Sequence, residues 1–231
     1  MPSVTLMTPP ETAQRELTFL LAGPERRLLL ALAGRVPRVI RSNHLTALGT
    51  LAAAGAGTAY ALTTYDARWL WVASLMLAIN WLGDSLDGTL ARVRGTQRPK
   101  YGYYLDHVVD AFSTAVIGAG IGLSPYVSLG IALGLVVAYL ALSINVYLES
   151  QVFGVFKIAY GRIGPTEVRL LLILLNTAVA ITRAPIGRVA DWTLGAALAS
   201  MVALFVWRFA RNLHRLAKLE PQRFRWWERA P

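Results

Sequence analysis

Long apolar stretches that are almost free of charge most limit what this 231-residue chain can fold into. A helix needs roughly 20 mostly apolar residues to cross a hydrocarbon core about 30 Å thick. Six segments meet this requirement, and they cover residues 45–64, 69–90, 103–123, 126–148, 168–186 and 189–209. Inside lipid, backbone polar groups must pair within their own segment, which favours helices. The sequence therefore predicts an all-α integral membrane protein with six transmembrane helices.

The 23 lysine and arginine residues are distributed unevenly around these segments. Twenty of the 23 lie before the first segment, between the second and third, around the junction of the fourth and fifth, or after the last; the exceptions are Arg68, Arg183 and Arg188. Because basic residues accumulate in cytoplasmic loops, we expect both termini to be cytoplasmic. A net charge of +10 would also suit nucleic acid, but 55% apolar and only 16% charged residues favour membrane lipids instead.

The two ends of the chain differ from its middle. Residues 11–35 mix apolar runs with charged side chains, which is typical of an amphipathic interfacial helix, here broken near Pro24. Basic and aromatic residues near the C-terminus indicate a second interfacial segment. The expected organisation is a cytoplasmic N-terminal segment over 1–41, a six-helix membrane domain over 42–212 and a cytoplasmic tail over 213–231.

Four of the six aspartates lie between positions 84 and 110. Asp84 and Asp87 are spaced to share one face of the second segment, and Asp106 and Asp110 are spaced to share one face of the third. The short connection between these segments predicts that the four carboxylates form one cluster. Small residues on the same faces should let the two helices approach closely; they are Gly88, Ala91 and Gly102.

Such a cluster is electrostatically unfavourable at the edge of a membrane unless a cation neutralises it. The chain has no cysteine and three histidines, so the fitting partner is a hard divalent cation such as Mg²⁺, Mn²⁺ or Ca²⁺. Basic residues from Arg92 to Lys100 follow and suit a phosphate-bearing substrate. The pattern favours phosphoryl transfer at the cytoplasmic surface. Two alternatives stay open: aspartates that pack helices, and carboxylates along the path of a divalent-cation transporter.

The residues around the aspartates resemble the signature of the CDP-alcohol phosphotransferase family, D-x2-D-G-x2-A-R-x8-G-x3-D-x3-D. The runs 84–92 and 102–110 contain every named position of that signature. Nine residues, 93–101, separate the runs where the family has eight. The additional residue lies in the connection, so both helical faces stay intact and only loop contacts to the substrate are in doubt.

The resemblance implies a role for each aspartate. Asp84, Asp87 and Asp106 would bind divalent metal, and two Mg²⁺ or Mn²⁺ ions are expected. Asp110 would be the general base that takes a proton from the acceptor hydroxyl, and it would also be a metal ligand.

The resemblance also implies residues that bind the nucleotide donor. Gly88 would let the nucleotide approach the helix backbone, Ala91 would belong to the same face, and Arg92 would neutralise phosphate. Asn43 and Thr46 resemble the family's N-x-x-T start of the first span, which contacts the nucleotide. A helix cap is an equally good interpretation of Asn43 and Thr46.

Candidates for the acceptor site lie in two places. His107 resembles the histidine of an Asp-His pair in choline and ethanolamine phosphotransferases. Residues 164–167 resemble a motif of some of those enzymes, in which Glu167 would read a cationic or hydroxylated head group and Arg169 would bind phosphate. The simpler interpretation is that Pro165 starts a helix and that Glu167 favours its N-terminus.

The function that the resemblance implies is a membrane enzyme of phospholipid biosynthesis. It would transfer a phosphatidyl group from CDP-diacylglycerol to an alcohol and release CMP. The alternative within the family uses CDP-choline or CDP-ethanolamine as donor and diacylglycerol as acceptor. Family members are often homodimers, so a homodimer is expected.

Overall fold

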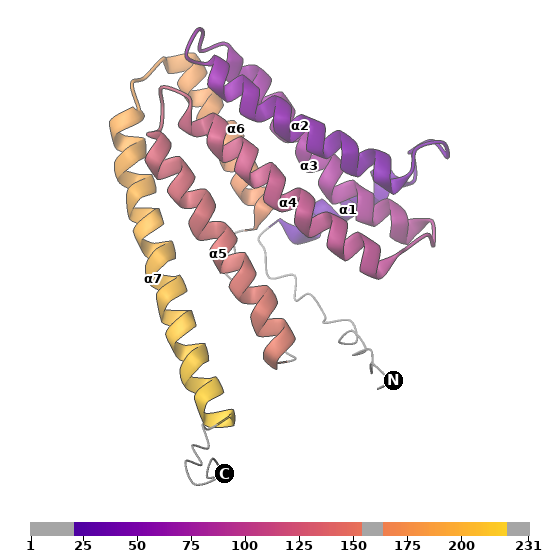
Figure 1. Ribbon diagram of the computed structural model, residues 1–231. Coiled ribbons are helices and arrows are strands. Elements are labelled where there is room, and N and C mark those ends of the chain that lie inside the picture. Colours follow the sequence, from indigo (N-terminus) through magenta and orange to yellow (C-terminus); the bar gives the residue numbers. More distant parts are fainter. Residues whose placement is uncertain (1–20, 154–163, 221–231) are drawn as a thin grey trace, which may run out of the picture.

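The computed structural model describes residues 21–153 and 164–220, and these residues form seven α-helices and no strand (Figure 1). The helices are α1 (Ala22–Ala33), α2 (Ser42–Leu62), α3 (Trp69–Val93), α4 (Pro99–Gly122), α5 (Leu129–Phe153), α6 (Pro165–Thr182) and α7 (Gly187–Leu219). Each of the six segments predicted from hydropathy corresponds to one helix from α2 to α7. Residues 11–20 of the predicted interfacial helix, and the aromatic end of the predicted tail, lie outside the described residues.

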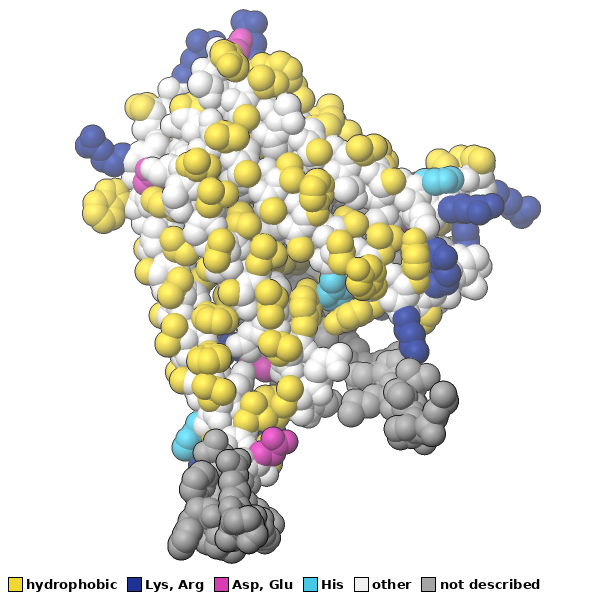
Figure 2. Space-filling model, in the orientation of Figure 1, with side chains coloured by type: hydrophobic (Ala, Val, Ile, Leu, Met, Phe, Trp, Pro, Cys, Tyr) yellow, Lys and Arg dark blue, Asp and Glu magenta, His cyan; other side chains and the backbone are white. Residues whose placement is uncertain are grey.

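Four of the helices are long and apolar enough to cross a membrane, namely α2, α5, α6 and α7. The other two long helices, α3 and α4, each carry two of the clustered aspartates and are not among the four. Large apolar side chains remain exposed on α5, α6 and α7. Figure 2 shows hydrophobic side chains spread over one face of the molecule, with lysine and arginine at its margins. This surface is suited to contact with lipid.

Helix α2 packs on both α3 and α4. The helices α1 and α6 pack on α3, α5 packs on α4, and α7 runs beside α5 (Figure 1). Glycines make the central contacts close. A Cβ atom on Gly83 would lie 2.6 Å from the backbone nitrogen of Gly49, and one on Gly120 would lie 2.2 Å from the carbonyl oxygen of Gly57.

The prediction that small residues bring α3 and α4 into close contact is wrong. Both helices pack mainly on α2. A Cβ atom on Gly102 would have no atom within 4 Å, and one on Gly88 would approach only the guanidinium of Arg92. The facing glycines of α2 provide the closer fit, so the two aspartate-bearing helices are each held against α2 rather than against each other.

Helix α1 is amphipathic and is docked on α3. Pro24 lies in its first turn, where a missing backbone N–H leaves no hydrogen bond unmade. Leu29 and Ala33 are buried together with Leu45, Leu86 and Leu90, which α2 and α3 contribute. The connection from α1 to α2 is fixed by Arg94, whose guanidinium donates to the carbonyl oxygens of residues 36, 37 and 40.

Candidate active site

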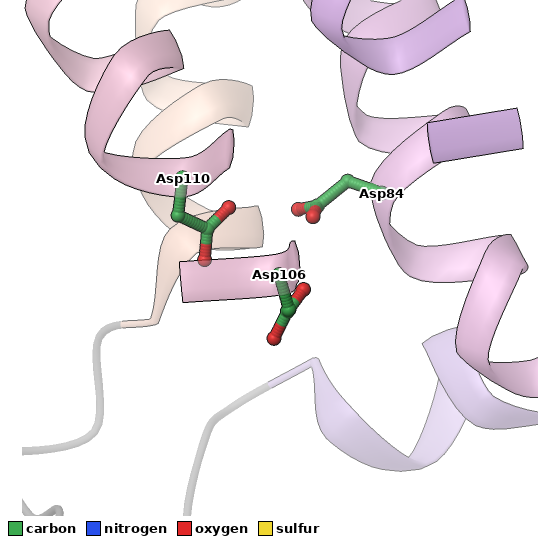
Figure 3. Close-up of side chains that lie close together, drawn as sticks. All are labelled: Asp84, Asp106 and Asp110. Carbon is green, nitrogen blue, oxygen red and sulfur yellow. The ribbon is translucent and has the colours of Figure 1, made fainter. Parts of the chain in front are cut away.

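Three of the four predicted metal ligands come together where α3 and α4 face each other (Figure 3). Asp84 on α3 and Asp106 and Asp110 on α4 each offer one carboxylate oxygen, and these oxygens lie within 4.8 Å of one another. All three residues are half-buried. Helical spacing puts Asp106 and Asp110 on the same face of α4, and Asp84 reaches them across the gap between the helices.

The fourth aspartate, Asp87, lies one turn further along α3. Its carboxylate accepts a hydrogen bond from the hydroxyl of Thr46, and its backbone carbonyl accepts one from the hydroxyl of Ser42, 2.8 Å away. Asp87 still lies within electrostatic reach of Asp84 and Asp106. The start of α2 therefore holds Asp87 beside the cluster, and Thr46 contacts a predicted metal ligand directly.

A positive charge lies against the cluster. Arg169 on α6 forms an ion pair with Asp84 at 2.9 Å, and the two side chains are only 15% and 24% exposed. Arg169 also acts electrostatically on Asp110. The predicted acceptor residue Arg169 is thus part of the aspartate cluster itself, although it lies 85 positions from Asp84 in the sequence.

The predicted donor-binding residues surround the end of α3. A Cβ atom on Gly88 would lie 3.4 Å from the guanidinium of Arg92, which donates to the hydroxyl of Thr89 at 2.9 Å. Ala91 is half-buried, and its carbonyl oxygen accepts the backbone N–H of Thr96, 3.0 Å away, at the end of α3.

Asn43, in the first turn of α2, bonds to residues at the start of α4 instead of capping its own helix. It donates to the hydroxyl of Tyr101 at 3.1 Å and accepts from Arg98 at 3.2 Å. The capping contact at the start of α2 instead comes from His44, whose Nδ1 accepts the backbone N–H of Arg41 at 3.3 Å. The cap interpretation of Asn43 and Thr46 is therefore wrong.

His107 lies in an aromatic group beside the cluster. Its ring centroid is 4.1 Å from that of Tyr103 and 4.7 Å from that of Tyr147 on α5, and its Nδ1 lies 3.9 Å from the carboxylate of Asp106. The Nδ1 atom also contacts the carbonyl oxygen of Tyr103 at 2.7 Å. His107 is 19% exposed at its side chain, so it lines the edge of the site.

The other predicted acceptor residue, Glu167, makes backbone contacts with both of its carboxylate oxygens. One oxygen accepts the N–H of Leu21 at 2.8 Å, and the other accepts the N–H of Gly164 at 2.9 Å. The second contact satisfies the backbone N–H of Gly164, the residue before α6, where Pro165 is the first residue. These bonds favour the structural interpretation of Glu167.

Two residues near the cluster were not predicted from the sequence. Tyr139 lies within electrostatic reach of Asp110 and Asp84, and Tyr147 lies within reach of Asp110 and Asp106. Tyr139, Ser143 and Tyr147 repeat every four residues on α5 and therefore share a face. This polar stripe within an otherwise apolar helix was the available signal.

The donor set fits a divalent cation. Carboxylate oxygens are the ligands that Mg²⁺ and Mn²⁺ prefer, and three of them lie close enough together to share one ion. Asp87, in electrostatic reach of two members of the cluster, is available at its edge. The fold and this site together define a helical membrane protein with a carboxylate cluster built for a hard cation.

Comparison with known proteins identifies the family. Residues 40–210 match the CDP-alcohol phosphatidyltransferase family, and because this match covers most of the chain, the protein belongs to that family. Its members are transferases of substituted phosphate groups that act in phospholipid biosynthesis, generally with a divalent cation, on a CDP-linked donor and an alcohol acceptor. An uncharacterised protein of Aquifex aeolicus (strain VF5) is 40% identical over 71 residues, 31% of this chain. That match spans 35% of the relative's own length.

Proposed function

We propose that this protein transfers a phosphatidyl group from CDP-diacylglycerol to an alcohol acceptor and releases CMP. The observation that carries the proposal is the convergence of Asp84, Asp106 and Asp110 from two helices, beside Arg169 from a third. Carboxylates and a guanidinium in one half-buried place suit a reaction in which phosphate groups must be held and a hydroxyl must lose a proton.

The four aspartates divide the chemistry. Asp84, Asp87, Asp106 and Asp110 hold one or two Mg²⁺ or Mn²⁺ ions, which when bound offset the charge of the donor's pyrophosphate. Asp110 takes the proton from the acceptor hydroxyl. It suits this role because it is half-buried and lies within electrostatic reach of Asp84, Asp106 and Arg169, so a hydroxyl bound at the cluster has a carboxylate next to it.

The donor nucleotide binds at the end of α3 and the start of α2. Arg92 neutralises phosphate. The small residues Gly88 and Ala91 beside it let the nucleotide approach the backbone of the helix. Asn43 orients the connection that borders this surface through its bonds to Arg98 and Tyr101, and Thr46 holds Asp87.

The acceptor site lies on the other side of the aspartates. Arg169 binds a phosphate or another anionic group of the acceptor, and His107 lines the approach. Glu167 supports α6 instead of contacting the acceptor, because both of its carboxylate oxygens already accept backbone N–H groups.

The membrane topology that fits this function has six spans, α2 to α7, with both termini and the active site on the cytoplasmic face. The distribution of basic residues supports it, since 20 of 23 lie on the side of the aspartate cluster. Residues 1–41, including α1, form the interfacial segment; residues 42–212 form the membrane domain; and residues 213–231 form a tail into which α7 continues. A homodimer is the expected assembly.

Release of CMP by the purified protein tests the proposal. CDP-diacylglycerol is supplied with a panel of alcohols and with Mg²⁺ or Mn²⁺, and CDP-ethanolamine and CDP-choline are supplied with diacylglycerol in parallel reactions. Activity only in the parallel reactions would replace the proposal with the alternative in which diacylglycerol is the acceptor. The aromatic group around His107 favours that alternative, because aromatic rings can hold a quaternary ammonium. Flux of Mn²⁺ into proteoliposomes without release of CMP from any donor would indicate a transporter instead.

A further inference from the structure

One carboxylate of α1 connects three helices at the side of the aspartate cluster. The Oε1 atom of Glu25 accepts hydrogen bonds from the indole N–H of Trp81 at 2.9 Å, the hydroxyl of Ser85 at 3.1 Å and the hydroxyl of Thr166 at 2.9 Å. Trp81 and Ser85 belong to α3, and Thr166 lies in the first turn of α6. All four side chains are half-buried, so these bonds are shielded from water and mutually strengthening.

A second connection runs in the opposite direction. Glu167 of α6 accepts the backbone N–H of Leu21, the residue before α1. Each of the two helices therefore supplies a carboxylate to the other, Glu25 from α1 and Glu167 from α6. The apolar face of α1 is buried against α3 and the start of α2 at the same time, through Leu29 and Ala33. Helix α1 is thus fixed to α3 by apolar burial and to α6 by hydrogen bonds.

The partners of Glu25 are direct neighbours of the active-site ion pair. Ser85 follows Asp84 in α3. Thr166 lies three residues before Arg169 in α6, so the two side chains are on the same face of that helix. The Asp84–Arg169 ion pair and the Glu25 bonds both connect α3 with α6 at this end of the helices, beside a direct bond from the indole N–H of Trp81 to the hydroxyl of Thr166 at 3.2 Å.

We propose that Glu25 is a positioning residue that holds α3 and α6 at the spacing at which Asp84 and Arg169 meet. This inference rests on the proposed function, because the site that Glu25 positions is the proposed site of phosphatidyl transfer. When Asp84 serves a cation and Arg169 serves a phosphate, their mutual ion pair weakens, and Glu25 keeps the two helices in place. Helix α1 then helps to position the active-site residues, in addition to any contact it makes with the membrane surface.

Replacement of Glu25 tests the proposal. Glu25→Ala removes all three bonds, and a displacement of the site by about 1 Å reduces kcat/KM by about 100-fold. Glu25→Gln keeps an acceptor oxygen at the same position, because all three bonds end on Oε1, so it should restore kcat/KM to near the wild-type value. A residue needed only for stability would lower Tm in Glu25→Ala without changing kcat/KM of the folded fraction, and that result would overturn the proposal.

The spacing of the helices can be measured directly. The chain contains no cysteine, so spin labels attach only at Leu75→Cys on α3 and Leu171→Cys on α6, both exposed positions, and dilution with unlabelled protein isolates the distance within one chain. We expect Glu25→Ala to shift or broaden the distance distribution and Glu25→Gln to leave it as in the parent. An unchanged distribution in Glu25→Ala contradicts the positioning role.

A milder pair of variants covers the case in which Glu25→Ala fails to fold. Thr166→Val removes the bond to Glu25 and the weaker bond that Thr166 accepts from Trp81, with little change of shape, and kcat/KM should fall several-fold. Thr177→Val is the matched control, because the Thr177 hydroxyl bonds only the carbonyl of Ile173 in its own helix, at 2.8 Å. Equal activity of the two variants would count against the proposal.

The proposed function and this inference can fail separately. If the wild-type protein releases CMP from no CDP-linked donor, the transfer reaction is refuted, whereas the spin-label distances and the affinity for Mn²⁺ still decide whether Glu25 positions the cluster. If the wild-type protein is active and Glu25→Ala is equally active with unchanged distances, only the inference is refuted.

Discussion

The contact between α2 and α3 is the most sensitive packing feature next to the active site. A Cβ atom on Gly83 would lie 2.6 Å from the backbone nitrogen of Gly49 and 2.6 Å from the carbonyl oxygen of Leu45, whereas ordinary contacts begin near 3.4 Å. Both neighbours are backbone atoms, so no side-chain rotation relieves the clash. Gly83→Ala must therefore move α3 away from α2 by about 0.8 Å, the difference between these two distances.

This displacement has consequences for stability and for activity. Overpacking of this kind lowers the free energy of unfolding by about 1–3 kcal/mol. It also stretches the 3.0 Å hydrogen bond from Asn80 to the carbonyl oxygen of Gly49, and Asn80 is almost fully buried. Asp84 is the next residue after Gly83, so it moves relative to the carboxylates of α4. A shift of nearly 1 Å at a reacting site reduces the rate by about 100-fold.

Thermal unfolding in detergent and the rate of CMP release measure the two effects. The matched control is Gly130→Ala on α5, where a Cβ atom would meet no atom within 4 Å, so stability and activity should stay near the wild-type values. Wild-type Tm and wild-type CMP release in Gly83→Ala would refute the packing of α3 on α2 described above.

Four further predictions concern the aspartates and the connection between α3 and α4. Asp110→Asn should reduce turnover by about 100- to 10,000-fold while donor binding persists, and substantial CMP release would remove Asp110 as the base. Asp84→Ala and Asp87→Ala should abolish metal-dependent binding of the donor in calorimetry, and an unchanged affinity for Mn²⁺ would contradict their role as ligands. Gly95, just after α3, has φ +64°, so Gly95→Ala should lower the free energy of unfolding by about 1 kcal/mol, measured by thermal unfolding. Deletion of the exposed Gln97 should leave CMP release unchanged if the additional residue of this connection is peripheral.

The positions of the helices could be predicted from the sequence because hydropathy is a local property. Every apolar segment of about 20 residues forms a helix, and the aspartates lie on common faces because helical spacing fixes the direction of neighbouring side chains. Family membership could be predicted for the same reason, since the whole motif lies within two consecutive helices and their connection.

Other features depend on which helices touch, and local spacing does not reveal this. The sequence suggested that Gly88 and Gly102 bring α3 and α4 together, but glycines elsewhere, such as Gly57 and Gly120, make the close contacts and pack both helices on α2. The sequence did not reveal the partners of charged residues either. Glu167 accepts a hydrogen bond from Leu21, 146 positions away, and Arg169 pairs with Asp84, 85 positions away.

The sequence by itself determined the helical membrane architecture, the family and the four aspartates, because each follows from residues close together in the chain. Only the tertiary structure decided that Thr46 holds Asp87, that Arg169 lies against the cluster, and that Glu25 of α1 connects α3 with α6. The physical reason is that helix pairing is set by how well whole faces fit, summed over many weak contacts. A polar side chain then bonds whatever that packing brings within reach.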